Sequence, residues 1–263
     1  MPTLDDHQSS KYSKILYLGD SSTGKTGSLV SLVEAGYKLR ILDMDNGLDS
    51  LVAFARKQCP DKLKNVLFET VRDKFKATRL GPTIDGVPVA YTKAVDLMSK
   101  WSDGTIPSEW GEEYIFVLDS LSALGQAAYA WADNLNPMAK DKRNIFFEAQ
   151  KSIERVIAML TSEQFHANVI IITHVQMKEN EETGITKGYA NSLGSALGPV
   201  IPRYFNTMIQ AKSEGSGKSL KRTISTVSSA MVDLKNPVPF KLDQILPLET
   251  GMKTIFEKLK EIK

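Results

Sequence analysis

The sequence has little of several features that would point to particular classes of protein. Its 263 residues contain one cysteine, Cys59, and a single thiol excludes an internal disulfide framework and a zinc site built from cysteines. No apolar run is as long as a membrane span, and the first ten residues are polar and acidic, unlike a secretion signal. We therefore expect a cytoplasmic protein, located in the host cell if a phage encodes it.

An excess of charge of one sign is also missing. The chain has 33 basic and 31 acidic residues, a net charge of +2, so overall charge does not indicate a nucleic-acid binder and any basic surface must be local. The length suits one large α/β domain with a full core. Because the sequence shows neither repeats nor a clear interdomain linker, we expect a single domain over residues 1–263.

The most informative stretch that is present is KILYLGDSSTGKTGS, residues 14–28. A short apolar run leads into an octet that fits G-x-x-x-x-G-K-[ST] at every fixed position. The glycines let backbone N–H groups point at phosphate oxygens, and the helix that follows adds partial positive charge. The predicted nucleotide-binding residues are Gly19, Asp20, Ser21, Ser22, Thr23, Gly24, Lys25, Thr26 and Gly27. Lys25 would reach the outer phosphates, and the Thr26 hydroxyl would bind Mg²⁺.

The rest of the chain alternates strand-like and helix-like patterns, which predicts a mostly parallel central sheet flanked by helices. We expect strands at 14–18, 37–42, 65–71, 114–120 and 168–174, helices at 25–34, 48–56, 94–101 and 137–164, closing strands at 204–212 and 222–234, and a short helix at 252–260. Residues 1–12 read as a loose arm, 72–90 as an inserted loop or small hairpin, and 213–263 as C-terminal strands and a short helix.

Polar residues at the ends of the buried strands complete the expected site. Asp119 ends the 114–120 strand and would hold a water bound to Mg²⁺, so Thr26 and Asp119 are the predicted metal residues. Hydrolysis of ATP also needs a carboxylate that orients and deprotonates water, and residue type alone leaves four candidates open: Asp43, Asp45, Asp49 and Glu69. Thr173 and His174 could touch the γ-phosphate or its water.

In their order along the chain and in their residues, these segments resemble the RecA-type ATPase core, over residues 15–210. The phrase ILDMDNGLD, 41–49, is similar to the RecA segment whose second acidic residue is the catalytic glutamate. The match implies that Asp45, one methylene shorter, activates water. LDSLSAL, 118–124, resembles the Walker B strand. ITHVQMK, 172–178, resembles the sensor strand, in which a glutamine couples the γ-phosphate to the DNA-binding loop, and His174 takes that position.

The same resemblance implies a partner and an assembly. Residues 179–191 would form a mobile loop that contacts single-stranded DNA, with Lys178, Lys187 and Tyr189 available for phosphate contact and base stacking. The compact build looks most like the phage-encoded minimal RecA-like ATPases, a group of AAA-type nucleotide-binding and single-strand annealing proteins. That likeness implies a filament or ring of identical subunits, with a single-strand DNA-binding protein as a further candidate partner.

In such assemblies a basic residue of the next subunit completes the site. DLKNP, residues 233–237, is similar to the Lys-Asn-Arg finger segment of relatives; Lys235 matches, but Pro237 stands in place of the arginine, for which Arg203 or Arg222 could substitute. The leading prediction is a Mg²⁺-dependent, DNA-stimulated ATPase of recombination or annealing. A non-catalytic ATP-gated scaffold or loader and a small-molecule or nucleotide kinase stay open, although no arginine-rich lid supports the kinase.

Overall fold

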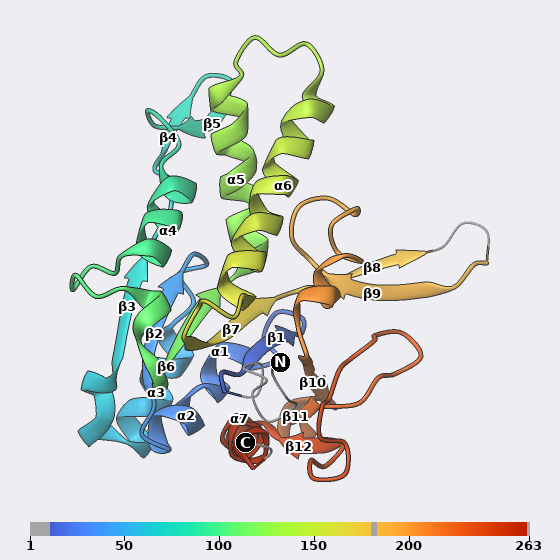
Figure 1. Ribbon diagram of the computed structural model, residues 1–263. Coiled ribbons are helices and arrows are strands. Elements are labelled where there is room, and N and C mark those ends of the chain that lie inside the picture. The colour runs from blue at the N-terminus through green and yellow to red at the C-terminus, as the bar shows by residue number, and fades with distance from the viewer. Residues whose placement is uncertain (1–10, 180–182, 262–263) are drawn as a thin grey trace, which may run out of the picture.

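The computed structural model describes residues 11–179 and 183–261 and is built on an eight-stranded sheet (Figure 1). Its strands are β1 (Lys14–Leu18), β2 (Lys38–Asp43), β3 (Val66–Thr70), β6 (Gly111–Asp119), β7 (Ala167–Thr173), β10 (Thr207–Glu214), β11 (Lys221–Ser225) and β12 (Ile245–Pro247). The spatial order is β12-β11-β10-β1-β7-β6-β2-β3. The six strands from β3 to β10 are parallel, and β11 and β12 continue the sheet antiparallel. The predicted fold class is therefore confirmed.

Helices cover both faces of this sheet. They are α1 (Lys25–Ser28), α2 (Val30–Glu34), α3 (Asp49–Gln58), α4 (Ala90–Ser99), α5 (Leu121–Leu135), α6 (Lys142–Thr161) and α7 (Leu248–Lys260), with 3₁₀ turns at Pro60–Asn65, Pro107–Glu109, Ile201–Tyr204 and Gly217–Ser219. Alternate residues of β1 enter two separate cores: Leu16 and Leu18 pack with α4–α6, whereas Ile15 and Tyr17 pack with α2, α3 and α7. All four are buried, which explains why the strand reads as an unbroken apolar run.

Several boundaries differ from those expected. The pattern at 137–164 becomes a helix only from Lys142, and α5, which follows β6 directly, was not predicted. The expected strand at 222–234 ends at Ser225, and the chain then runs as an irregular segment up to β12. The helix expected at 25–34 is divided at Leu29 into α1 and α2.

Two of the expected irregular segments acquire definite structure. Most of the loose arm, residues 1–10, lies outside the described residues, but Tyr12 is buried and stacks on His166 with ring centroids 5.7 Å apart, so it is not part of an arm. The 72–90 insertion contains an antiparallel hairpin, β4 (Phe75–Thr78) and β5 (Gly81–Ile84). Figure 1 shows this hairpin beside the far end of α5.

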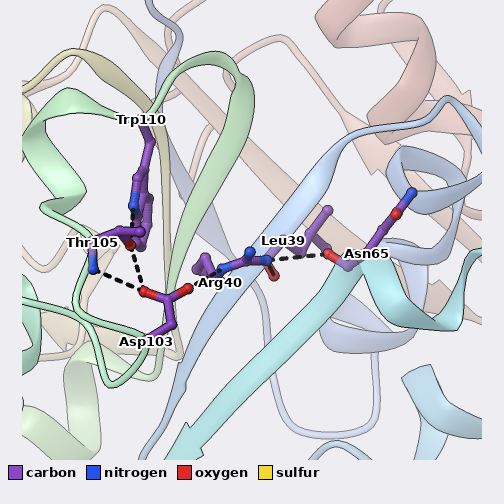
Figure 2. A network of polar contacts seen from close by, with 6 residues as sticks. All are labelled: Leu39, Arg40, Asn65, Asp103, Thr105 and Trp110. Carbon is purple, nitrogen blue, oxygen red and sulfur yellow. Dashed lines mark hydrogen bonds and ion pairs between the residues drawn. The ribbon is translucent and has the colours of Figure 1, made fainter.

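A buried arginine joins β2 to the segment that precedes β6 (Figure 2). Arg40 donates to the carbonyl of Leu39 at 3.1 Å and lies 3.9 Å from the Asp103 carboxylate. Asp103 accepts from the Thr105 hydroxyl, which accepts from Trp110 Nε1 at 2.7 Å. These bonds lower the pKa of Asp103, with the Thr105 hydroxyl as the main cause. The network holds in place the turn-rich 100–110 segment, which precedes β6. The carboxyl ends of the strands are therefore available for the functional site.

Candidate functional site

The octet that matches the phosphate-binding motif forms the loop between β1 and α1. Gly24 has φ +90°, a left-handed conformation that favours glycine, and it caps α1. The Lys25 ammonium donates to the carbonyls of Gly19 (2.7 Å) and Asp20 (2.9 Å) and is buried within the loop. Burial lowers the pKa of Lys25, while Asp119, Asp20 and Asp45 raise it. The lysine is thus placed on the loop, ready to exchange carbonyls for phosphate oxygens.

The loop and its surroundings enclose a cavity of about 500 Å³. Five of the predicted nucleotide-binding residues line it: Ser21, Ser22, Gly24, Lys25 and Thr26. The others shape the loop. Gly19 and Asp20 hold Lys25 through their carbonyls, Thr23 donates its hydroxyl to the Asp20 carbonyl at 2.8 Å, and Gly27 is buried against Phe54. Asp45, Asp119 and His174 line the same cavity, so the structure brings these predicted residues together.

Thr26 and Asp119 meet directly, with the threonine hydroxyl donating to Asp119 Oδ2 at 2.7 Å. Asp119 is the last residue of β6 and is buried. Burial raises its pKa to about 6, against the lowering effect of the Thr26 hydroxyl. Two oxygen ligands that converge beside a phosphate loop fit Mg²⁺, a hard cation that takes its remaining ligands from water and substrate phosphates. Among the described residues, no three His, Cys, Asp or Glu side chains form a metal site of their own.

The acidic residues that sequence reasoning could not separate have different environments. Asp43 is buried; its carboxylate accepts from the Gly47 N–H at 3.2 Å and the Thr70 hydroxyl at 3.1 Å, so it holds the turn after β2. Asp45 is exposed and lines the cavity, as does Asp49 at the start of α3. Glu69 is not among the residues that line it. Of the four candidate carboxylates, Asp45 and Asp49 are therefore the two that line the cavity.

His174 lies at the end of β7, between the nucleotide cavity and the next segment of the chain. Its Nδ1 is 3.3 Å from the hydroxyl of Ser122, and that hydroxyl donates to the Asn191 carbonyl at 3.1 Å. Burial and the positive charge of Lys25 lower the pKa of His174, so the ring is neutral at physiological pH. Asn191 in turn donates its N–H to the His174 carbonyl at 2.9 Å. A polar network therefore leads out of the cavity.

Comparison with known proteins places the chain in a family. A protein-family model described as "AAA domain" matches residues 11–238, most of the chain. The chain belongs to this AAA-domain family. No curated protein sequence matches it.

The AAA-domain chain is similar to many solved structures, and three of them share 11 to 14% sequence identity with it. A KaiC-like protein from Pyrococcus horikoshii is 11% identical, with 82% of this chain and 78% of the other covered and a TM-score of 0.41. The RadB recombinase is 13% identical, with 82% and 80% covered and a TM-score of 0.46. The flagellar accessory protein FlaH from Methanocaldococcus jannaschii is 14% identical, with 92% and 88% covered and a TM-score of 0.44. In the described part of the AAA-domain chain, no helix is long and apolar enough to cross a membrane.

The predicted mobile loop of this AAA-domain chain, 179–191, includes a strand over Thr186–Ala190 that the sequence did not indicate. β8 (Val175–Glu179) and β9 (Thr186–Ala190) form an antiparallel hairpin that projects from the molecule (Figure 1), and residues 180–182 lie outside the described part. The hairpin packs on the segment that contains Val232. Gly188 approaches Val232, Val175 and Met177 so closely that an added Cβ would lie 2.7 to 3.1 Å from their side chains. The Gly and charged residues of this stretch indicated a loop, and the contact with Val232 could not be predicted from them.

The opposite face of the hairpin carries the three predicted DNA-contacting residues. Lys178 pairs in register with Lys187, and Tyr189 pairs with Gln176, so these four side chains share one face. Three of them, Lys178, Lys187 and Tyr189, line a hollow of about 280 Å³ together with Glu179, Thr183, Ile185 and Pro199. Lys187 also forms an exposed ion pair with Asp233 at 2.9 Å, which raises the pKa of Lys187.

Lys235, the predicted finger, does not line the nucleotide cavity of its own chain. Its ammonium donates to the carbonyls of Pro202 (2.6 Å) and Phe205 (3.0 Å). To reach a neighbouring subunit's nucleotide it would have to leave both acceptors. Arg203, the first alternative, is bound to Glu154 and to the Tyr204 hydroxyl. Both residues therefore lie away from the nucleotide cavity of their own chain, as a residue that serves a neighbouring subunit would.

Sequence reasoning missed the positions of three residues around the site, since it did not single out Ser122 or Asn191 and named Arg222 only as a candidate for a neighbouring subunit's site. Ser122 and Asn191 build the network beside His174, and Arg222 lines the nucleotide cavity of its own chain. Ser122 is three residues beyond Asp119, a spacing that places it in the first turn of α5, but no signal indicated a helix there. Asn191 and Arg222 are brought in only by the pairing of distant strands, which the sequence does not specify.

Proposed function

We propose that this protein is a Mg²⁺-dependent ATPase that binds single-stranded DNA and acts, as an oligomer, in phage-type recombination or annealing. The observation that carries the proposal is the convergence of Lys25, the Thr26–Asp119 pair, Asp45 and His174 on one cavity of about 500 Å³. A phosphate loop, two oxygen ligands for a cation, an exposed carboxylate and a neutral imidazole are the groups that hydrolysis of a nucleoside triphosphate requires.

In the proposed reaction each side chain has a separate task. Lys25 and the loop N–H groups hold the phosphates, and Thr26 with Asp119 holds Mg²⁺, which neutralises charge on the phosphates when bound. Asp45 orients the attacking water and accepts its proton. The His174 ring, kept neutral by burial and by Lys25, offers a hydrogen bond to the γ-phosphate or the water without adding charge.

The hairpin formed by β8 and β9 is the proposed DNA-binding element. Like charges directly opposite each other in a hairpin are unfavourable, so a phosphate between Lys178 and Lys187 is favoured, and Lys187 exchanges its exposed ion pair with Asp233 for the phosphate. Tyr189 on the same face supplies a ring on which a base can stack. The paired lysines therefore favour a polyanion with exposed bases, which single-stranded DNA is.

The assembly and the biological process rest on the resemblance to RecA-type proteins. In the proposed filament or ring, a cation from the neighbouring subunit completes the site, and Lys235 is that residue if it exchanges its two carbonyl acceptors for a phosphate. A single-strand DNA-binding protein is a proposed further partner, because it would occupy the same DNA before this protein does.

The deciding experiment measures ATP hydrolysis with and without single-stranded oligonucleotides, together with solution mass with and without nucleotide. We expect oligonucleotides to stimulate hydrolysis and nucleotide to increase the mass. Tight ATP binding with negligible turnover in the presence of DNA would instead favour the scaffold or loader. Stimulation by a phosphoryl acceptor and not by DNA would favour the kinase.

The DNA-binding face is tested with the double variant Lys178→Ala, Lys187→Ala. Because each contact to a single strand contributes about 0.7 to the slope of log Kd against log salt, the variant should lower that slope by about 1.4. The matched control is Lys57→Ala, an exposed lysine of α3, which should leave the slope unchanged. An unaltered slope in the double variant would contradict the assignment of the hairpin.

A further inference from the structure

Arg222 reaches the phosphate loop from the C-terminal part of the sheet. It belongs to β11 and pairs in register with Ser213 of β10, the strand beside β1. Its side chain lines the same cavity as Lys25, Thr26 and Asp119. Arg222 Cδ lies 3.3 Å from the position that a Cβ of Gly24 would occupy. The arginine therefore stands next to the loop of its own chain.

The position of this arginine is set by packing of the C-terminal elements on the loop. Leu248, the first residue of α7, is buried, and its Cδ2 lies 2.5 Å from the same missing Cβ of Gly24. Figure 1 shows α7 beside β11 and β12, close to the start of the chain's first helices. Gly24 thus serves a close approach as well as its left-handed turn. Of these C-terminal elements, β11 contributes Arg222 to the lining of the cavity, and α7 packs against Gly24 through Leu248.

The guanidinium of Arg222 lines the cavity without a protein partner in the described part of the chain, whereas Arg203 and Arg40, which lie away from the cavity, have one. Within residues 11–179 and 183–261, it makes neither a hydrogen bond nor an ion pair, although it is exposed to the cavity. Arg203 is bound to Glu154 and Tyr204, and Arg40 to Asp103. An arginine stays charged at any physiological pH, and its fork of donors matches a phosphate bidentately. An arginine whose guanidinium donors are unpaired beside a phosphate loop therefore indicates a phosphate ligand.

The strand order determines on which side of a bound nucleotide Arg222 lies. β7, β6 and β2, which carry His174, Asp119 and Asp45 at or just beyond their ends, lie on one side of β1, whereas β10 and β11 lie on the other. A nucleotide in the loop would therefore have the carboxylates and the cation on one flank and Arg222 on the opposite flank. Lys25 lies between them.

We propose that Arg222 binds the phosphate chain of the nucleotide held by the phosphate loop of its own subunit. This assignment rests on the proposed ATP binding and adds a phosphate-contacting residue to it. It replaces the expectation that Arg222 serves a neighbouring subunit, because the geometry places this side chain against Gly24 of its own chain. The site is then clamped between the parallel core and the antiparallel C-terminal strands.

Binding of MgATP to Arg222→Ala, Arg222→Lys and Lys221→Ala tests the contact. Loss of a hydrogen bond to a charged group should weaken binding about 10- to 100-fold in Arg222→Ala, and Arg222→Lys should recover part of it because it keeps the charge but loses the fork. Lys221, the preceding exposed residue of β11, points to the other face of the strand, so Lys221→Ala should bind as the wild type does. Equal thermal unfolding temperatures show that each variant folds.

Mixing of two impaired variants, at an ATP concentration at which each alone hydrolyses little ATP, tests whether the arginine acts within its own subunit. When Arg222→Ala and Lys25→Ala chains are mixed, a residue that served the neighbour would create sites with an intact Lys25 and a neighbour's Arg222, and hydrolysis would return. We expect no recovery. Recovery on mixing, or MgATP binding by Arg222→Ala equal to that of the wild type, would overturn this assignment alone. A wild-type chain that binds no MgATP would overturn the proposed function together with it.

Discussion

At the scale of single residues, Asp43 and Asp45 show how two carboxylates with the same apparent role in the sequence are separated by their surroundings. Asp43 is buried and accepts two hydrogen bonds from the protein, whereas Asp45 is exposed to the nucleotide cavity. We predict that Asp45→Asn keeps MgATP binding and stability but lowers the rate of hydrolysis about 10²- to 10⁴-fold, the contribution of a general base. Steady-state hydrolysis and binding measured on the same preparation check this.

Asp43→Asn is the contrasting variant, and its expected defect is in stability. Asn keeps one acceptor oxygen, so either the Gly47 N–H or the Thr70 hydroxyl loses its strong acceptor, and a lower unfolding temperature should accompany a smaller loss of rate. Full DNA-stimulated hydrolysis by Asp45→Asn would refute its assignment as the base. Asp49, which lines the same cavity, would then be the next carboxylate to replace.

Lys14 gives a residue-scale prediction about pH. It is buried, donates to the carbonyls of Phe165 and Ala167, and burial lowers its pKa to about 7 from an ordinary 10.5. Between pH 7 and 10.5 the unfolded chain therefore binds more protons at this residue than the folded chain, so the free energy of unfolding should rise with pH.

The size of that effect is obtained by comparison with Lys14→Met, which keeps the apolar stem but cannot titrate. The wild type should gain stability over the variant by up to about 1.4 kcal/mol per pH unit between pH 7.5 and 9.5. Urea unfolding curves at both pH values measure the difference, since other titrating groups are common to the two proteins. Parallel dependences on pH would show that Lys14 titrates alike in both states.

At the scale of elements, α5 packs on the segment after β9 so closely that Gly125 has no room for a side chain. An added Cβ would lie 2.3 Å from the Ser192 carbonyl oxygen. Helix propensity alone favours Gly125→Ala by about 1 kcal/mol, but overpacking against backbone costs about 1 to 3 kcal/mol. We therefore predict a net loss of stability, measured by denaturant unfolding.

Gly251→Ala in α7 is the matched control for that variant. Its added Cβ would lie 2.9 Å from Ile224 Cδ1, the end of a side chain that can rotate, so helix propensity should offset most of the cost. If Gly125→Ala is as stable as the wild type, the distance between α5 and Ser192 is greater than in the structure.

The same elements show what the sequence could and could not predict. The parallel strands were predictable because strands buried on both faces, such as β6 and β7, read as apolar runs that end in polar residues. The octet is local, so its loop was predictable too. The β8–β9 hairpin was predicted as a loop, because the contact between Gly188 and Val232 is not local. The placements of Lys235 and Arg222 also depend on non-local pairing.

At the scale of the whole molecule, the proposed nucleotide and DNA sites are joined by a short polar network. Ser122 contacts His174 on the cavity side and the Asn191 carbonyl on the other, and Asn191 directly follows β9. The Thr173 hydroxyl donates to the same carbonyl. A change at His174 on binding ATP would therefore move the base of the hairpin, and a change at the hairpin would move His174.

This connection predicts a reciprocal effect on two affinities. Whatever factor a non-hydrolysable ATP analogue applies to the Kd for single-stranded DNA, DNA must apply to the Kd for the analogue. In Ser122→Ala both coupling factors should come closer to 1, the value for sites that do not affect each other. Both should change by the same amount, about 2- to 10-fold, which is what one lost hydrogen bond contributes. Fluorescence titration of each ligand in the absence and presence of the other measures all four constants. Ser99→Ala, which removes a hydroxyl bonded within α4, should leave them unchanged. If Ser122→Ala retains the full coupling, the two sites communicate by a route other than His174 and Asn191.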